Sequence, residues 1–579
     1  MSADQNQTNQ LITENLDIWT SAIKAKGRTG RGSNKTYELY GIKKLRNLIL
    51  DMAVRGLLVP QDPNDESASE LLKKIAAEKE HLIKKGKLKK QKALSPINEE
   101  EKPFELPEGW EWDKLGNFIY LEMGQSPPSK YYNQDGEGMP FFQGKADFGE
   151  KYPTPRYWCI KPQKYSYIND VLLSVRAPVG PTNISNINCC IGRGLAALRP
   201  LLDVPTMYID CLLKGFRSQL ESFATGTTFA AVSKVVVENF LISIPPLKEQ
   251  KRIVAKVEEL MILCDQLEQK TDTSIKAHKL LVENLLNALT QAKDHKTFQQ
   301  AWQRIAENFG NLFTTEHSID QLQQTILQLA VMGKLVPQDP KDEPASELLK
   351  KIAAEKAKLI KEGKIKKQKP LPPISDEEKP FELPEGWGFY RLDKTLNKIT
   401  DGTHHSPKNG SSGEYYYISA KNIKDDGVKT TNATFVTKEI HDDIYSRCNP
   451  ERGDILYIKD GATTGIVTLN NLDEPFSMLS SVALLKPSKK LNNKYLLIAL
   501  RSPFFYSEMR SGMSGVAITR VTLKKLNFAF IPIPPFNEQK RIVTKVDELI
   551  ALGDQLKSQI THSKKIQTKI ADALTKITN

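Results

Sequence analysis

Apolar residues recur at alternating spacings of four and three in two long stretches of the chain, from Ile253 to Ala288 and from Ile542 to Ile577. This spacing is typical of a coiled-coil-like helix, although polar residues such as Thr271 and Ser274 weaken the middle of the first stretch. Neither stretch contains proline. Each therefore predicts one helix of about 35 residues, on the order of 50 Å long.

Two shorter amphipathic stripes precede these helices, one in each half of the chain. An apolar stripe needs a partner, and for the stripe from Ile319 to Leu329 the local partner is the preceding Ile253 helix, folded back as an antiparallel hairpin. The stripe from Ile42 to Met52 has no such neighbour unless the C-terminal helix supplies one, which would close the chain into a pseudo-twofold ring. The stripe positions are Ile42, Leu45, Ile49, Met52, Ile319, Leu322, Ile326 and Leu329.

Two inserts, residues 104–244 and 381–533, interrupt the helical pattern with short β-rich runs. Examples are DVLLSV from Asp170 and DILYIK from Asp454, with glycine and asparagine turns around them. Each insert predicts a compact α/β domain of about 140 to 150 residues. The expected fold class is α+β, with two α/β domains separated by two long antiparallel helical spacers.

The helical frame occurs twice, whereas the inserts share little identity. LVPQDP and EKPFELPEGW each return at an offset of 277 residues, as Leu58 and Leu335 show for the first of them. PPLKEQKRIVAKVEEL from Pro245 returns as PPFNEQKRIVTKVDEL from Pro534, at an offset of 289, so the blocks between the copies differ in length by 12 residues. A duplicated frame around two divergent inserts predicts one scaffold that carries two different recognition domains.

Composition changes place the domain boundaries. Prolines restrict each EKPFELPEGW segment to extended geometry, so we interpret it as the entry of an insert, with Trp110 and Trp387 as anchors of the following core. The predicted segments are an N-terminal segment (1–41), the first repeat helices with a Lys-rich linker (42–102), the first insert domain (103–247), a central spacer helix (248–310), the second repeat helices with their linker (311–379), the second insert domain (380–536) and a C-terminal spacer helix (537–579).

The chain is basic, with 82 Lys and Arg against 69 Asp and Glu, a net charge of +13 and a pI near 9.1. This balance favours a polyanionic partner, although a merely soluble basic protein would show it too. Lys-rich runs follow His81 and Leu359, and each is either a solvated helix face or a phosphate contact. The six cysteines show no CxxC spacing, which predicts buried reduced thiols, and the absence of a leader or an apolar span predicts a soluble, cytoplasmic chain.

Motifs for catalysis are weak in this sequence. GxGxxG is absent, and the candidate phosphate loop from Gly138 to Lys145 has the wrong spacing. The segment from Ile533 to Phe536 lacks the Asp or Asn that amino-methyltransferases place before Pro-Pro. The ExK-like Glu100 to Lys102 lies in a charged linker, which favours surface charge over a nuclease site. His404-His405 has no third ligand at suitable spacing, so we predict no metal site.

Polar loops suited to nucleic acid follow the same order in both inserts. The first insert offers MGQSPPSKYY, FFQGKADF, SVRAPVGPTN and ATGTTFAAVSK, and the second offers TDGTHHSP, ISAKNIKDDG, YIKDGATTGIV and GMSGVAITRVTLKK. Gln, Asn, Arg and Lys can bond base edges, while glycine amides and Thr hydroxyls suit phosphates. The matching order in two dissimilar domains is stronger evidence than any single loop.

This order of loops, each ending in Ile-Pro-Pro and Glu-Gln-Lys-Arg-Ile-Val, resembles the specificity subunit of type I restriction-modification systems. In that family the inserts are target recognition domains, and the repeated helices dock two methyltransferase subunits, which restriction-translocase subunits join. The resemblance implies that this chain is no enzyme and binds no cofactor, whereas its partners use S-adenosylmethionine, ATP and Mg. One departure is Asn169-Asp170, where the family usually has Gly-Asp.

We therefore expect each insert to enter the major groove at one half of a split, asymmetric double-stranded DNA target, with the half-sites about one helical turn or roughly 34 Å apart. Faces 249–267 and 538–556 are candidates for methylase docking, with helix packing within the chain as the alternative. The alternative functions are a helical adaptor that binds proteins through its inserts, and a stand-alone nuclease. The predicted DNA-binding residues are Gln125, Ser126, Lys130, Gln143, Lys145, Arg176, Thr227, Lys234, His404, His405, Lys421, Asn422, Lys459, Thr463, Thr519 and Lys524.

Overall fold

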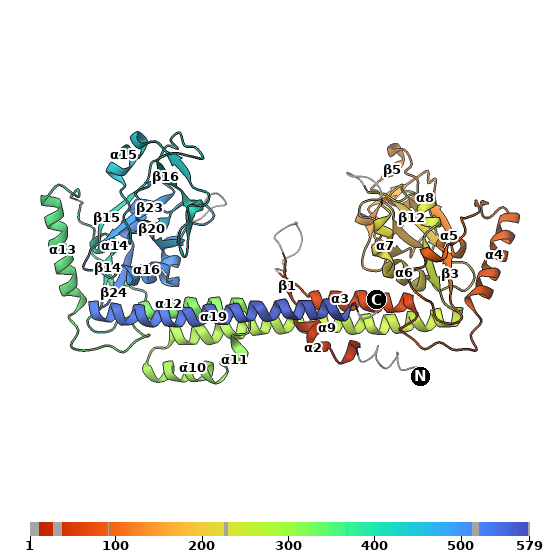
Figure 1. Ribbon diagram of the computed structural model, residues 1–579, viewed down its shortest axis with the longest axis horizontal. Coiled ribbons are helices and arrows are strands. Elements are labelled where there is room, and N and C mark those ends of the chain that lie inside the picture. The colour runs from red at the N-terminus through yellow and green to blue at the C-terminus, as the bar shows by residue number, and fades with distance from the viewer. Residues whose placement is uncertain are drawn as a thin grey trace. The chain divides into compact units, whose positions relative to one another are not determined.

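The structure is a computed structural model that describes residues 11–26, 37–90, 92–224, 230–367, 369–511 and 520–576. It divides into two compact units (Figure 1), of which unit 1 comprises residues 1–275 and 562–579, and unit 2 comprises residues 276–561. Both long helices, α9 (Leu247–Gln291) and α19 (Phe536–Leu574), cross the boundary between the units. Each unit therefore contains one insert and parts of both long helices.

The two predicted long helices are confirmed, and the first is longer than expected. α9 has 45 residues and α19 has 39, and each begins directly after a Pro-Pro pair, a position at which proline favours a helix start. In unit 2 their segments run in opposite directions (Figure 1), as predicted. The predicted spacer 248–310 is not one helix, because Asp294 caps a new helix, α10 (His295–Glu307), by accepting a hydrogen bond from Thr297 N at 2.8 Å. A short α11 (Phe309–Leu312) follows.

The N-terminal stripe of unit 1 finds its partners in both long helices. Helix α3 (Tyr40–Arg55) buries its apolar face in the same cluster as Ile253 and Leu260 of α9. Ala571, near the end of α19, belongs to that cluster, and Asp572 accepts a hydrogen bond from the Tyr40 hydroxyl at 2.6 Å. The C-terminal helix thus supplies a neighbour for the N-terminal stripe, which confirms that the chain closes on itself. The pattern alone did not indicate the contact with α9. The segment before α3 forms α2 (Leu16–Ser21), β1 (Lys24–Ala25) and β2 (Tyr37–Glu38).

The stripe of unit 2 lies on α12 (Glu316–Val331) and also has two partners. Ile319 packs with Val282 and Leu286 of α9, as the predicted hairpin requires. Ile326, about two turns further along the same stripe, belongs instead to a cluster that contains Ile542 of α19. Each stripe therefore packs against the beginning of the long helix that follows its own insert.

The first insert forms an α/β domain around two small sheets. A four-stranded sheet has the order β10-β9-β12-β4, a five-stranded sheet has the order β5-β7-β6-β11-β8, and β3 pairs with β13 where the chain enters and leaves. Strand β9 is buried along its whole length, as its VLLS sequence predicts. The elements are β3 (Glu111–Lys114), α5 (Leu115–Phe118), β4 (Tyr120–Met123), η2 (Ser129–Tyr131), β5 (Tyr132–Asn133), β6 (Met139–Phe142), η3 (Lys145–Asp147), β7 (Tyr157–Cys159), β8 (Tyr165–Ser166), β9 (Val171–Ser174), β10 (Thr182–Ile184), β11 (Cys189–Ile191), β12 (Leu195–Arg199), α6 (Thr206–Gly215), α7 (Arg217–Ser222), α8 (Lys234–Glu238) and β13 (Leu241–Ile244).

The second insert repeats this plan with different strand lengths. Its four-stranded sheet has the order β15-β23-β20-β21, a three-stranded sheet has the order β19-β16-β22, and β14 pairs with β24 at the entry. Strand β20, from the predicted DILYIK run, is buried throughout. The elements are β14 (Gly388–Arg391), α14 (Leu392–Thr395), β15 (Leu396–Asp401), β16 (Tyr415–Ile418), η5 (Ala420–Asn422), β17 (Ile423–Lys424), β18 (Gly427–Val428), β19 (Thr434–Val436), α15 (Lys438–Arg447), β20 (Ile455–Ile458), β21 (Val467–Leu469), β22 (Ser477–Met478), β23 (Val482–Pro487), α16 (Asn493–Arg501), α17 (Pro503–Arg510), α18 (Leu523–Phe528) and β24 (Phe530–Ile533).

The repeated ASELLKKIAAEK segments form two helical arms, α4 (Ala68–Lys84) and α13 (Ala345–Lys361). Each arm buries an Ala, a Leu and an Ile at equivalent positions and exposes most of its lysines. A 3-10 turn stands before each insert, η1 (Glu99–Glu101) and η4 (Asp376–Glu378). Trp110 is only 6% exposed, and its indole N–H bonds Glu249 rather than facing solvent, as predicted for an anchor.

All six cysteines are free and buried, as the sequence predicts. Over the described ranges, every helix is too short or too polar to cross a membrane.

Candidate nucleic-acid interface

The polar loops of the first insert meet at one edge of its sheets. The loop after β4 joins the turn after β11, because Gln125 N donates to Ile191 O at 3.0 Å. That turn joins the end of β9, because Val175 N donates to Gly194 O at 3.0 Å. Arg176 in turn forms a bridge with Ala231, just before α8. Four segments distant in sequence therefore present their side chains from one surface.

The side chains at this edge are polar and mostly exposed. Ser126 Oγ accepts a hydrogen bond from Arg193 N at 3.2 Å, which places the Gly-Arg-Gly turn beside the loop after β4. Lys130 lies further along, with its ammonium 5.3 Å from the centre of the Tyr131 ring. Of the predicted residues, Gln125, Lys130, Gln143, Lys145, Arg176 and Lys234 are exposed, and Ser126 is half-buried.

A buried carboxylate shapes the turn that carries Gln143 and Lys145. Asp147 accepts hydrogen bonds from the backbone N–H of Gln143 at 2.7 Å and of Gly144 at 3.3 Å. Arg156 pairs with the same carboxylate at 2.6 Å, which offsets the cost of burying it. These bonds fix the turn, and the Lys145 side chain is exposed on it.

The second insert builds the same edge from different residues. Thr403 N donates to Met478 O at 2.8 Å, which corresponds to the bond between Gln125 and Ile191. Val521 N donates to Lys459 O at 2.7 Å, and Asp460 forms a bridge with Arg520. The loop framework is thus shared, although the side chains on it differ.

A buried ion network supports this edge in unit 2. The Lys459 ammonium, in a side chain only 2% exposed, lies 3.4 Å from Asp401 Oδ2 and 3.2 Å from Asp460 Oδ2. Asp401 also lies 3.4 Å from His404 Nε2, and Asp460 lies 3.3 Å from Arg520 Nε. His404 and Arg520 are exposed at the ends of this network, and the exposed Arg447 also lies 3.4 Å from Asp401, so the buried charges fix where these three side chains stand.

Two predicted DNA-binding residues of the second insert have structural roles instead. Asn422 is 2% exposed; its Oδ1 accepts a hydrogen bond from Ser419 N at 3.1 Å and its Nδ2 donates to Lys429 O at 3.0 Å. It occupies the position that Asp147 has in the first insert. Lys459 is used inside the ion network. Both side chains are buried, and their polar groups hold the loops in place. Other, exposed residues extend from those loops.

The remaining predictions for this insert stay predictions. His404, His405, Lys421, Thr463 and Lys524 are exposed. Thr227 and Thr519 lie outside the described residues.

Sequence reasoning missed two exposed arginines, Arg193 and Arg520. Arg193 lies in the Gly-Arg-Gly turn, and Arg520 lies in the quoted GMSGVAITRVTLKK loop, from which Thr519 and Lys524 were selected instead. For Arg193 the available signal was its two flanking glycines at the end of a β run, because such an Arg is an exposed bidentate donor on a tight turn.

The departure at Asn169 has a conformational explanation. Asn169 has φ 72°, and Gly453, at the equivalent position of the second insert, has φ 86°. Asn is among the few residues with a side chain that tolerate this left-handed conformation, so it replaces glycine here without changing the turn.

The cysteines beneath these loops are protonated. Burial raises the pKa of Cys189 and of Cys190, which lie on β11 beneath the loops, to about 11, so both are thiols at neutral pH. Within the described part of the chain, no three His, Cys, Asp or Glu side chains cluster in a way that could hold a metal ion.

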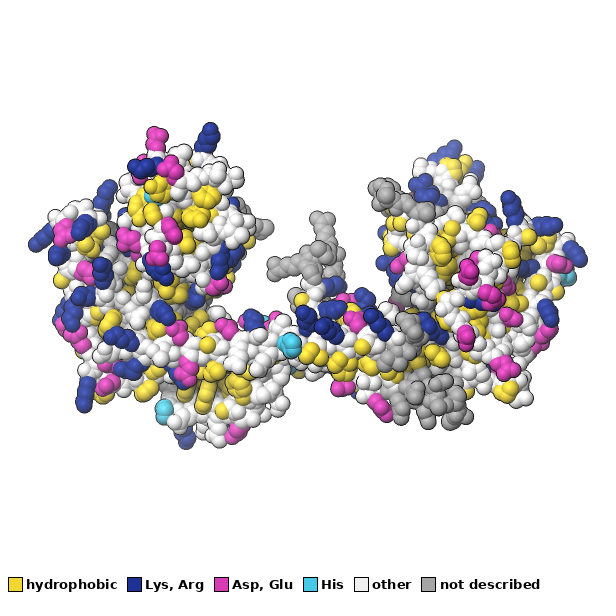
Figure 2. All heavy atoms as spheres, viewed as in Figure 1, with side chains coloured by type: hydrophobic (Ala, Val, Ile, Leu, Met, Phe, Trp, Pro, Cys, Tyr) yellow, Lys and Arg dark blue, Asp and Glu magenta, His cyan; other side chains and the backbone are white. Residues whose placement is uncertain are grey.

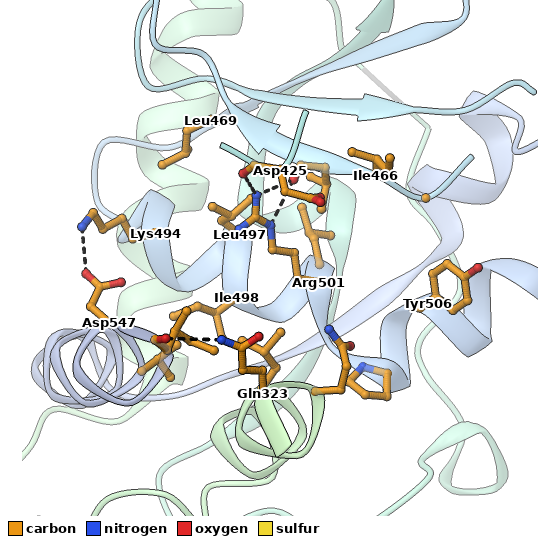
Figure 3. A pocket seen from close by; sticks show the side chains of 18 of the residues that line it. Gln323, Asp425, Ile466, Leu469, Lys494, Leu497, Ile498, Arg501, Tyr506 and Asp547 are labelled. Carbon is orange, nitrogen blue, oxygen red and sulfur yellow. Dashed lines mark hydrogen bonds and ion pairs between the residues drawn. The ribbon is translucent and has the colours of Figure 1, made fainter. Parts of the chain in front are cut away.

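Each unit has a groove where the insert meets the helices. In unit 2 a groove of about 1230 Å³ lies between α12, α16 and α19 (Figure 3), and Lys494 Nζ and Asp547 Oδ2 form an ion pair of 2.9 Å at its wall. Gln323 of α12 donates to Asp554 of α19 at 2.9 Å in the same groove.

Unit 1 has a smaller groove of about 470 Å³ at the matching place. Arg46 and Asp265 line it, and they form an ion pair of 2.6 Å. By the sequence offsets they correspond to Gln323 and Asp554. The repeated frame therefore carries two equivalent grooves.

Comparison with known protein families matches both the inserts and the repeated helices that carry them. The family model of the type I restriction modification DNA specificity domain matches residues 107–277 and 384–563. The chain belongs to this family. Both matched ranges contain one insert and the first part of the long helix that follows it, so the family signature is itself duplicated.

Relatives in the type I specificity family match nearly the whole chain. The type I restriction enzyme EcoAI specificity subunit of Escherichia coli is 42% identical over 98% of this chain and 98% of its own length. The EcoEI specificity subunit of the same species is 39% identical, again over 98% of both chains. The crystal structure of the HsdS subunit from Thermoanaerobacter tengcongensis is 33% identical over 45% of this chain and 64% of that chain, with a TM-score of 0.28.

Proposed function

We propose that this chain reads a bipartite, asymmetric DNA target and directs adenine methylation and restriction by partner subunits. The observation that carries the proposal is the shared loop framework of the two inserts, on which the side chains differ. Equivalent loops let both domains approach a groove in the same way, while different side chains select different bases. An exposed Gln125 and Arg193 in one insert, against His404 and Arg520 in the other, support unlike half-sites.

The partners we propose are two methyltransferase subunits and, with them, restriction-translocase subunits. Two copies of one protein bind through equivalent surfaces, and the grooves beside α9 and α19 are such a pair. The predicted docking faces, 249–267 and 538–556, include groove residues such as Val257 and Val546. In this proposal the chain acts in the cytoplasm without a cofactor of its own. The partners would use S-adenosylmethionine, ATP and Mg²⁺, and adenine methylation would require them to flip the base.

The decisive experiment maps methylated adenines in a cell that expresses this chain with its methyltransferase partner. The proposal expects one motif with two unlike half-sites at a fixed spacing. Replacing residues 103–247 with the corresponding insert of a relative should change one half-site only. A contiguous or symmetric motif would contradict two unlike recognition domains.

The same strains separate the alternatives. A protein-binding adaptor would leave genomic methylation independent of either insert. A stand-alone nuclease would cleave DNA when the purified chain receives only a divalent metal, and we expect no cleavage in that assay.

A further inference from the structure

A basic cleft lies beside the candidate DNA-binding edge of the first insert. Its volume is about 340 Å³, and Gly124 and Gln125, at the loop after β4, line it. Lys164 and Lys234 of the insert line it together with Lys89 and Lys90. The last two lysines come from the linker after α4, which precedes the first residue matched by the family model, 107.

The linker is fixed on the insert by specific contacts. Gly86, with φ 69°, turns the chain after α4, and Leu88 N then donates to Leu82 O at 3.2 Å. Leu88 itself packs against the main core of unit 1. Further along, Ser95 Oγ donates to Asn239 Oδ1, just after α8, at 3.1 Å. Lys89 and Lys90 therefore lie between two attachment points, rather than on a free tail.

The charges in the cleft are not balanced. Lys164 pairs with Glu122, and Lys234 Nζ lies 3.4 Å from Glu238 Oε1. Among the described residues, neither Lys89 nor Lys90 has a carboxylate within ion-pair distance. Elsewhere on the α4 and α13 arms, Figure 2 shows Lys and Arg side chains together with Asp and Glu. Two ammonium groups beside a DNA-binding loop, without acidic partners, favour an anion in the cleft.

We propose that Lys89 and Lys90 bind backbone phosphates of the DNA that the Gln125 loop contacts. The inference rests on the proposed function and deepens it, because it assigns the Lys-rich arm to the DNA interface. Ammonium groups act on phosphates as point charges without base preference, so the arm adds affinity and the insert loops add selectivity. The second arm carries Lys366 and Lys367 at the same positions of the repeat.

The test measures binding of the full-length chain to a short random-sequence DNA duplex across a series of salt concentrations. Each phosphate contact contributes about −0.9 to the slope of log K against log salt, so K89A/K90A should make the slope less negative by about 2. K89R/K90R should keep the wild-type slope, because the positive charges remain. Circular dichroism and thermal unfolding should be the same for all variants.

K73A/K74A is the matched control. It removes two lysines from the exposed face of the same arm, where Lys73 pairs with Glu70 and Lys74 with Glu66. This variant should keep the wild-type slope. An unchanged slope in K89A/K90A, or an equal change of slope in K73A/K74A, would overturn the inference.

The two proposals fail separately. Comparison of the mapped target duplex with the random duplex measures selectivity in the wild-type chain. If the wild-type chain binds both duplexes equally, that result counts against the proposed function. The salt slope on random DNA tests the arm by itself. If both proposals are correct, K89A/K90A should weaken binding to the target duplex and to the random duplex by similar factors.

Discussion

Gln61 and Glu249 are 188 residues apart in sequence, yet Gln61 Nε2 donates to Glu249 Oε1 at 3.2 Å. Trp110 Nε1 donates to the other oxygen of the same carboxylate at 3.1 Å. Unit 2 repeats this joint, with Gln338 and Trp387 on Glu538, each at 3.0 Å. The joints bring together the repeated LVPQDP, EKPFELPEGW and EQKRIV segments. The repeated segments are therefore the parts that attach each insert to its long helix.

Gln61→Ala should destabilise unit 1, and Gln338→Ala should destabilise unit 2. Gln61 Nε2 also bonds the Gly56 carbonyl at 2.6 Å, at the end of α3, so the substitution leaves buried acceptors unsatisfied. Each change should cost about 2 kcal/mol. Hydrogen exchange of peptides from each unit measures this loss separately. Gln303→Ala, on the exposed face of α10, is the control and should change neither unit. A uniform effect of Gln61→Ala on both units would contradict a local joint.

The Glu249 carboxyl should make the stability of unit 1 depend on pH. Burial raises its pKa from 4.5 to about 7, despite the hydrogen bonds from Gln61 and Trp110 that lower it. Between these pH values the folded unit keeps a proton that the unfolded chain has released. The stability that this proton contributes is therefore complete below about pH 4.5 and is lost as the pH rises to about 7.

Glu249→Gln should remove this dependence. The amide cannot ionise, so the difference in unfolding free energy of unit 1 between pH 5 and pH 8 should shrink by up to about 3 kcal/mol. Denaturant unfolding at a series of pH values, monitored by hydrogen exchange of peptides from unit 1, measures this difference. Glu538→Gln should leave unit 1 as in the wild type. Identical pH profiles for Glu249→Gln and wild type would show that another group is responsible.

The periodic parts of the fold could be predicted from the sequence, because their signal is local. The apolar seams of α9 and α19 and the buried runs of β9 and β20 each lie within one segment. The apolar seam to Ala288 stopped three residues before the end of α9, but the single spacer helix 248–310 was wrong, because the apolar spacing gives little weight to a single Asp294, whose side chain caps the next helix.

The site was harder to predict, because polarity does not distinguish a supporting residue from an exposed one. Asn422 and Lys421 are adjacent polar residues on one turn, but only Asn422 points into it. Lys459 meets Asp401, which is 58 positions away, so no local pattern contains the pair. The order of the loops was visible in the sequence, whereas the edge at which they meet depends on hydrogen bonds between distant segments, such as that from Gln125 N to Ile191 O.

Asp401→Ala should destabilise the edge of unit 2 more than any exposed substitution there. It removes one of two carboxylates from a Lys459 ammonium that is 2% exposed, and a buried charge with a missing partner costs about 3 kcal/mol. Asp401→Ala combined with Lys459→Met removes both charges and should recover most of the loss. Hydrogen exchange at the backbone amides of the loop near His404 measures the loss of stability. Equal instability of the single and double variants would show that the two charges do not act as a pair.

Arg193→Ala and Arg520→Ala should each weaken recognition of one half-site. A guanidinium that bonds a base edge in two places contributes about 1 to 3 kcal/mol of discrimination, and its loss should relax the sequence at one position of the motif. Methylation mapping with each variant should show different relaxed positions, one in each half-site. A change limited to binding strength, equal on target and random duplexes, would assign that arginine to phosphate instead. Arg520 starts from an ion pair of 3.3 Å with Asp460 that DNA must compete with, whereas the Arg193 side chain extends from a glycine-flanked turn. For this reason we expect Arg193→Ala to cause the larger loss.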